Sequence, residues 1–389
     1  MQNFRFCSPT EIIFGKDTHT TVGKETKKYG SKVLLHYGGG HIKRSGLYEQ
    51  VVSSLTDAGV DFVELGGVKP NPRLDLVHRG IAIARDNGVD FVLAVGGGSV
   101  IDSSKAIATG ALYDGNVWDF YCGKAAPEAT LPVGVVLTIP AAGSEASKSS
   151  VLTDVEGGDK RPANFEIQRP KFAIMNPELT FSLPPYQTAC GAADIMAHAI
   201  ERYFTPTKDV EFTDRLCEAG LLTVIGNAPK VLAQPDDYAA RAEIMWAGTV
   251  IHTDLFSTGR VGDWASHRIE HELSSINDVA HGAGLAIILP AWMQYVYKQD
   301  VDRFVQYAVR VWNAPQDFFD PEKTALEGIA RTKAYFKSIG LPVSLAEIGI
   351  GEQHFERIIG NCTKDAEGKM GSFMRLGDDD MRAILEIAK

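Results

Sequence analysis

An apolar segment that runs directly into glycine is the feature of this sequence that most constrains its fold. Phe91–Val95 reads FVLAV and is followed at once by Gly96–Gly98. Because no polar residue alternates with the apolar ones, we expect a strand buried on both faces, as in a parallel sheet covered by helices. Two similar runs, Val33–Tyr37 and Val133–Ile139, also end in loops of small residues. The sequence therefore predicts a doubly wound α/β unit.

The periodicity of the chain changes near residue 180. Before that point, predicted strands alternate with predicted helices, including a strand at Val60–Leu65 and a helix over residues 74–87. Beyond it, apolar residues recur with the 3.6-residue period of helices, in the segments Tyr186–Tyr203, Glu211–Gly226 and Tyr238–His252. We therefore expect an α/β domain over residues 1–180 and an all-helical domain over residues 181–389, with the boundary at a pair of prolines.

Composition excludes several classes of protein. The 389 residues carry 39 basic and 49 acidic side chains, a net charge of −10, which argues against a nucleic-acid or anionic-membrane partner. No apolar run approaches the roughly 18–20 residues that cross a bilayer, and the first residues do not resemble a secretory signal. The five cysteines contain no CxxC pair, so neither a disulfide framework nor a zinc knuckle is indicated. The sequence predicts a soluble, cytoplasmic protein.

Two glycine-rich turns predict a phosphate site. Gly96–Gly98 ends one strand and Gly38–Gly40 ends another, and glycine lets a ligand approach the backbone closely. Ser99 and Asp102 have the spacing of a capping box, so we expect Ser99 to cap the next helix, whose N-terminus favours an anion. Neither turn matches the GxGxxG fingerprint. The turns indicate a nucleotide without naming it, and a tight turn with no ligand stays open as the alternative.

The helical half contains a carboxylate and three or four imidazoles at the spacing of metal ligands. Asp194 and His198 are four residues apart, and so are His267 and His271, which places each pair on one face of a helix. His281 follows at an expected helix start. Carboxylate with imidazole suits Fe²⁺ or Zn²⁺. Spacing alone does not decide between His267 and His271 as the ligand, and a single DxxxH pair is also compatible with an ordinary surface pair.

Taken together, these motifs resemble the iron-containing alcohol dehydrogenase family, and within it the butanol dehydrogenase-like, NADPH-dependent aldehyde reductase branch. The segments that carry the resemblance are spread from residue 14 to residue 282: FGK (14–16), YGGG (37–40), PNP (70–72), GGGSVID (96–102), GSE (143–145), NPELT (176–180), DxxxH and HxxxH with HG. The chain departs from that branch at Ala142, where a threonine is common.

The resemblance implies a Rossmann-like dinucleotide-binding domain, a helical metal domain, and reversible oxidoreduction of small alcohols and aldehydes. It assigns one divalent metal, Fe²⁺ or Zn²⁺, to Asp194, His198, His267 and His281, and places His271 near the nicotinamide and the substrate oxygen. The candidate nucleotide-binding residues are Gly38, Gly39, Gly40, Gly97, Gly98, Ser99, Asp102, Thr138, Ser144, Lys160 and Leu179.

Cofactor choice and assembly are also expectations. NAD-preferring relatives commonly carry an aspartate where this chain has Gly39, so we expect NADP(H), with Lys43 and Arg44 near its 2′-phosphate. We expect a homodimer in which the strand within residues 10–15 contributes to the interface. Two other readings stay open: a lyase of the dehydroquinate synthase type that uses NAD and zinc, and a redox-inactive metal-binding protein.

Overall fold

The computed structural model describes residues 1–389 as two compact units. One unit is Cys7–Leu183, and the other is Pro184–Lys389 together with Met1–Phe6. The first residues are attached to the helical unit through backbone and side chain, because Gln2 N donates to Gly259 O at 2.9 Å and Gln2 Nε2 donates to Thr207 Oγ1 at 3.2 Å.

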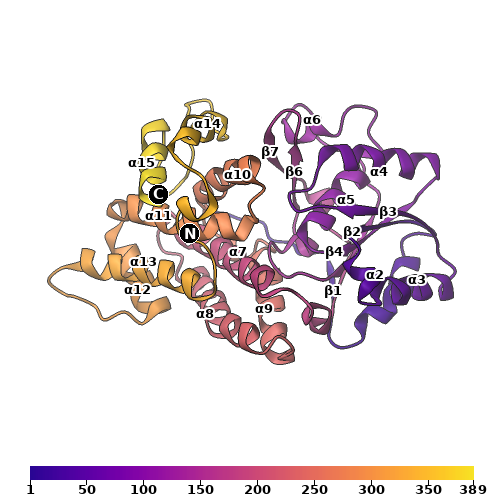
Figure 1. Ribbon diagram of the computed structural model, residues 1–389, viewed down its shortest axis with the longest axis horizontal. Helices are drawn as coiled ribbons and strands as arrows, with labels where there is room; N and C mark the ends of the chain where they lie inside the picture. The colour runs from indigo at the N-terminus through magenta and orange to yellow at the C-terminus, as the bar shows by residue number, and fades with distance from the viewer. The chain divides into compact units, whose positions relative to one another are not determined.

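Six parallel strands form the sheet of the first unit (Figure 1), in the order β1-β8-β5-β4-β2-β3. The strands are β1 (Glu11–Phe14), β2 (Lys32–Gly38), β3 (Asp61–Val68), β4 (Phe91–Gly96), β5 (Val133–Leu137) and β8 (Phe172–Met175). From β2 onward this is the doubly wound order 2-1-3-4-5, with β1 added at the edge. The order reverses between β2 and β4, and sheets of this kind bind ligands beyond the carboxyl ends of the strands at such a point.

Helices cover both faces of this sheet, as the sequence predicts. They are α1 (Val22–Lys27), α2 (His41–Arg44), α3 (Leu47–Asp57), α4 (Leu74–Asp86), α5 (Gly98–Gly110) and α6 (Trp118–Tyr121). Side chains of α1 and α3 share one buried cluster with Val33 and Leu35 of β2. On the opposite face, the buried His36 of β2 lies 2.8 Å through Nε2 from Ser103 Oγ of α5. The fold class expected from the sequence is thus confirmed for this unit.

Two features of the first unit differ from the expected elements. The sequence between Gly40 and Gly59 has the pattern of one helical stretch but forms two helices, α2 and α3, because Gly46 has a positive φ of 78° that interrupts the helical backbone. An antiparallel hairpin of β6 (Ser149–Asp154) and β7 (Asp159–Asn164) follows β5 and was not predicted. This hairpin is joined to α5, because Val151 N donates to Asp102 Oδ2 at 3.0 Å.

The second unit is helical throughout. Its helices are α7 (Pro185–Tyr203), α8 (Glu211–Ala233), α9 (Tyr238–Ile251), α10 (Ala265–Asn277), α11 (His281–Val296), α12 (Val301–Trp312), α13 (Pro321–Ser338), α14 (Phe355–Asn361) and α15 (Asp378–Ala388). Its hydrophobic core includes the fully buried Phe204, Trp292 and Phe304, and α7 and α11 contribute many of the other core residues.

Helix α8 is long and apolar enough to cross a membrane by length and composition alone. Its buried face packs into the core of the unit through Cys217, Leu221 and Val224. Asp214 on the same helix lies 2.6 Å from Arg260 Nη2 and also pairs with Arg303. These apolar and ionic contacts attach one face of α8 to the unit, whereas Phe212 and Leu222 on the same helix are exposed.

Candidate nucleotide and metal sites

The two glycine turns lie side by side at the carboxyl edge of the parallel sheet. Gly38 ends β2 and Gly96 ends β4, and these strands are neighbours with Tyr37 opposite Val95. Thr138 follows the next strand, β5, and its N–H donates to Gly96 O at 3.0 Å. The structure therefore gathers segments that are far apart in the sequence at the switch point of the sheet.

The expected capping box at the start of α5 is wrong. The helix begins at Gly98 with Gly97 as the N-cap, and no side chain caps it. Asp102 instead accepts a hydrogen bond from Ser144 Oγ at 2.6 Å, in addition to that from Val151. Because these partners take up the Asp102 carboxylate, no side chain competes for the first-turn N–H groups of α5, which can face an anion.

Packing explains why some of these glycines have no side chain, but it does not explain the others. A Cβ on Gly97 would lie 2.8 Å from Ile139 Cβ, so this position has no room for a side chain. A Cβ on Gly98 would have only an ordinary contact at 3.8 Å, and one on Gly39 would meet nothing within 4 Å. The backbone is therefore bare and accessible at Gly39 and Gly98, where neighbouring side chains do not require it.

A buried lysine holds the loop that contains Ser144. Lys105 Nζ on α5 donates to Ser144 Oγ at 2.9 Å, to Ser147 O at 3.0 Å and to Ser149 O at 2.7 Å. Burial lowers the pKa of Lys105 to about 8, although Asp102 and Glu145 oppose this shift. Burial also raises the pKa of Asp102, with Lys105 acting in the opposite direction. Ser144 is thus fixed by α5 on both its donor and its acceptor side.

The remaining candidate nucleotide contacts occupy different elements. Lys160 is a buried residue of the β7 strand. Leu179 lies in a short 3₁₀ helix, Pro177–Thr180, which follows β8 and is capped by the Asn176 side chain.

Asn71 follows β3, is 7% exposed and has a φ of 54°, which is unusual for a residue other than glycine. That backbone strain could not be read from the sequence, although the PNP motif marks the position.

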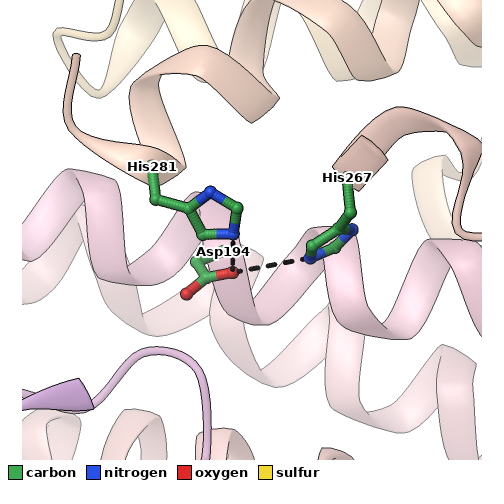
Figure 2. A group of neighbouring side chains, drawn as sticks. All are labelled: Asp194, His267 and His281. Carbon is green, nitrogen blue, oxygen red and sulfur yellow. Dashed lines mark ion pairs between the residues drawn. The ribbon is translucent and has the colours of Figure 1, made fainter. Parts of the chain in front are cut away.

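The four expected metal ligands converge in the helical unit. Asp194 Oδ1 lies 3.4 Å from His198 Nε2, 3.9 Å from His267 Nε2 and 3.7 Å from His281 Nε2. Figure 2 shows the imidazoles of His267 and His281 directed at the Asp194 carboxylate from two different elements. Both Asp194 and His267 are buried.

Three helices build this arrangement. Asp194 and His198 are one turn apart on α7, His267 lies near the start of α10, and His281 is the first residue of α11. Gly282 lets α11 approach α7, because a Cβ there would lie 2.0 Å from Cys190 O. The glycine of the HG pair is therefore needed to bring His281 to Asp194.

Two buried glutamates that sequence reasoning missed orient the imidazoles. Glu201 Oε2 accepts a hydrogen bond from His267 Nδ1 at 2.7 Å, and Glu270 contacts His281 Nδ1. Both glutamates are fully buried. A carboxylate at Nδ1 keeps the proton there and leaves the Nε2 lone pair for a cation. The only signal in the sequence is that Glu201 lies three residues after His198 and Glu270 three after His267.

The pKa values of two of these imidazoles are shifted in opposite directions by burial and nearby charge. Burial lowers the pKa of His267, but the carboxylates of Glu201, Asp194 and Glu270 together outweigh it and the pKa is raised overall. Burial lowers the pKa of His198 well below its usual value, and the neighbouring His252, His267 and Arg202 lower it further. His198 therefore favours the neutral state that a metal ligand needs.

These residues fit a divalent cation. Ligand atoms of a tetrahedral site with bonds of about 2.0–2.1 Å lie about 3.3–3.4 Å apart. The imidazole Nε2 atoms lie 3.4–3.9 Å from Asp194 Oδ1, and the ligand atoms of Asp194, His267 and His281 all lie within 4.8 Å of one another, a group that does not include His198. His267 Nε2 is buried and has no hydrogen-bond partner, as expected of an atom whose partner is an ion. His271 is also buried, with its ring centroid 5.6 Å from that of His281, and forms a second group with Glu270 and His281. The geometry thus favours His267 over His271 at the Asp194 carboxylate.

The first unit is a doubly wound sheet with bare glycine turns, and the second unit holds a carboxylate–imidazole centre. These two units define a protein that binds a nucleotide and a metal. Residues 9–177 match the sequence model of iron-containing alcohol dehydrogenase, and residues 188–389 match that of the C-terminal part of the Fe-containing alcohol dehydrogenase family. The chain belongs to the iron-containing alcohol dehydrogenase family. Membership implies alcohol dehydrogenase chemistry with a metal and a nicotinamide cofactor.

Similar proteins cover the whole chain. It is 44% identical over 386 residues to the probable NADH-dependent butanol dehydrogenase 2 of Bacillus subtilis, with 99% of each chain covered. It is 35% identical to the NADPH-dependent aldehyde reductase YqhD of Escherichia coli, with 100% of each covered. The crystal structure of NADH-dependent butanol dehydrogenase A from Thermotoga maritima matches with a TM-score of 0.96 and 40% identity, covering 100% of this chain and 99% of that one.

Proposed function

We propose that this chain reduces small aldehydes to primary alcohols, and catalyses the reverse reaction, with NADP(H) and one Fe²⁺ or Zn²⁺. The observation that carries the proposal is the convergence of three imidazole Nε2 atoms on Asp194 Oδ1, in a chain whose other unit has bare glycine turns at a sheet switch point. Butanol dehydrogenases and an aldehyde reductase among its relatives support small aliphatic aldehydes as the substrate class.

The metal-binding side chains would be Asp194, His198, His267 and His281. A divalent cation held there supplies Lewis acidity toward a carbonyl oxygen, and the nicotinamide cofactor supplies hydride. Glu201 keeps the His267 proton on Nδ1, so that Nε2 is free to bind. This assignment contrasts with a redox-inactive metal-binding protein, which would not need the nucleotide turns.

His271 is the proposed proton donor for the substrate oxygen. Reduction of a carbonyl consumes one proton in addition to the hydride, and an imidazole can hold and donate a proton. His271 lies one helical turn after His267 and beside His281, as the distance between the rings shows. Its role differs from that of a ligand because it would hold and release a proton rather than bind the cation.

The nucleotide would rest on the two glycine turns, Gly38–Gly40 and Gly97–Ser99. The uncapped first turn of α5 offers backbone N–H groups to a pyrophosphate. Gly39 carries no charge and faces open space, which supports NADP(H), because an aspartate at this position would repel a 2′-phosphate. Lys43 is paired with Glu64 at 3.4 Å, so Arg44 is the better-placed cation of the two for that phosphate.

Assembly and location complete the proposal. Strand β1 is an edge strand that pairs only with β8, and Phe14 is 37% exposed there, which supports a homodimer formed through this edge. All five cysteines are free, which supports a reducing, cytoplasmic compartment.

The test is consumption of NADPH or NADH with butyraldehyde, before chelation, after chelation and after Fe²⁺ or Zn²⁺ is restored. We expect turnover that chelation abolishes and metal restores. Turnover that survives complete metal removal would contradict the proposal. A dehydroquinate synthase-type lyase would show no net cofactor consumption with an aldehyde.

A further inference from the structure

The three imidazoles of the metal centre have different kinds of group next to their Nδ1 atoms. His267 and His281 each have a buried glutamate at Nδ1. At His198 the neighbour of Nδ1 is a cation, because Arg202 Nη1 lies 3.4 Å from it. The centre therefore has two imidazoles with an acceptor at Nδ1 and one with a donor.

Arg202 is fixed in this position by all three of its nitrogens. Nη1 donates to His198 O at 2.7 Å, Nη2 to His252 Nδ1 at 3.0 Å, and Nε to Ser257 Oγ at 2.9 Å. The guanidinium also lies 4.6 Å from the centroid of the Trp264 ring. Since Arg202 is 1% exposed, its guanidinium has no aqueous alternative to these contacts.

The chemistry of arginine decides which tautomer of His198 this contact favours. An imidazole that binds a cation through Nε2 carries its proton on Nδ1. Arginine has five N–H donors and no acceptor, so it can face the Nδ1 lone pair but cannot accept from an Nδ1–H group. With the proton on Nε2, His198 instead points it toward Asp194 Oδ1, 3.4 Å away.

We propose that Arg202 is a positioning residue that holds metal-free His198 in the Nε2–H tautomer and so weakens the bond of His198 to the metal. The ion is then held mainly by Asp194, His267 and His281, and His198 binds only when its proton moves to Nδ1, against the guanidinium. The cation would consequently exchange more readily than two carboxylate-backed imidazoles alone would allow. This inference rests on the proposed metal site.

The test compares the full-length parent with Arg202→Gln and Arg202→Lys. Glutamine supplies a carbonyl oxygen that accepts from His198 Nδ1, whereas lysine keeps the charge and has no acceptor. Competition with a chromophoric chelator measures Zn²⁺ affinity, and nitrogen NMR of the metal-free protein reports the His198 tautomer. Circular dichroism confirms that each variant is folded.

We expect Arg202→Gln to bind Zn²⁺ about tenfold or more tightly than the parent, on the scale of outer-shell effects on metal affinity, with Arg202→Lys close to the parent. We also expect the Nε2–H tautomer in the parent and Nδ1–H in Arg202→Gln. Equal or weaker Zn²⁺ affinity in a folded Arg202→Gln, or an Nδ1–H tautomer in the metal-free parent, would overturn the inference. If Arg202→Gln does not fold, the tautomer of the parent decides alone. Failure of the parent to bind Zn²⁺ would instead refute the proposed metal site.

Discussion

Replacing Glu201 with glutamine tests whether the second layer of residues sets metal affinity. Glu201 is fully buried, and its carboxylate accepts from His267 Nδ1 at 2.7 Å and from His267 N at 3.2 Å. Glutamine has nearly the same shape but no charge, so it stabilises the Nδ1–H tautomer of His267 less. We expect divalent-metal affinity to fall about 10–100-fold, the usual effect of removing such a partner. That loss corresponds to about 1.4–2.7 kcal/mol of binding free energy.

The assay is the same chelator competition, at one pH and one ionic strength, with Glu218→Gln as the matched control. Glu218 is a buried glutamate of the same unit that accepts from Tyr203 Oη at 3.1 Å and pairs with Arg215 and Arg310. We expect the control to keep the parent affinity. A Glu201→Gln variant that binds metal as tightly as the parent, or equal weakening in both variants, would contradict this role of Glu201. Glu201→Gln is expected to weaken metal binding, whereas Arg202→Gln is expected to strengthen it.

Four further predictions follow from the two units. His281→Ala should lose metal and turnover together, measured by metal analysis and aldehyde reduction, and a variant with stoichiometric metal and full turnover would disprove the ligand assignment. Gly39→Asp should lose at least about tenfold more kcat/KM with NADPH than with NADH, because like charges meet; a parent that already favours NADH would show our interpretation of this turn to be wrong. Lys105→Met should lower the free energy of unfolding by about 3–5 kcal/mol in urea titrations, since Ser144 Oγ, Ser147 O and Ser149 O lose their buried donor and Asp102 loses a nearby positive charge; a change below 1 kcal/mol would contradict this. Light scattering should show a dimer that Phe14→Glu dissociates, whereas a monomeric parent would exclude the β1 interface.

The fold was largely predictable because its signals are local. Runs such as Phe91–Val95 are apolar on both faces and end in glycine, so they identify buried parallel strands without any knowledge of their neighbours. The 3.6-residue period likewise identifies α7, α8 and α9. The order of the strands and the hairpin β6–β7 depend on pairing between distant segments, for which a single sequence carries no comparable signal.

The candidate metal centre was likewise predictable from the sequence only in part. Asp194 and His198 are recognisable because a helix brings residues four apart to one face. Spacing alone left His267 and His271 equivalent, and only the family resemblance favoured His267. The structure adds the physical reason, because the packing of α7, α10 and α11 brings His267 Nε2 to Asp194 Oδ1. Glu201, Glu270 and Arg202 were missed because their contacts with the imidazoles join residues whose proximity follows from helix packing.

The capping box at α5 failed for a related reason. Ser99 and Asp102 have the correct spacing, but the Asp102 carboxylate is taken by Ser144 and Val151, which are more than forty positions away in the chain. Tertiary hydrogen bonds therefore override the local capping motif.

The most direct test of the account is anomalous diffraction from crystals of the protein loaded with Zn²⁺. The proposed metal site predicts one strong peak within coordination distance of Asp194 Oδ1 and of Nε2 of His198, His267 and His281. A peak between Glu270, His271 and His281, or no ordered metal in the helical unit, would contradict it.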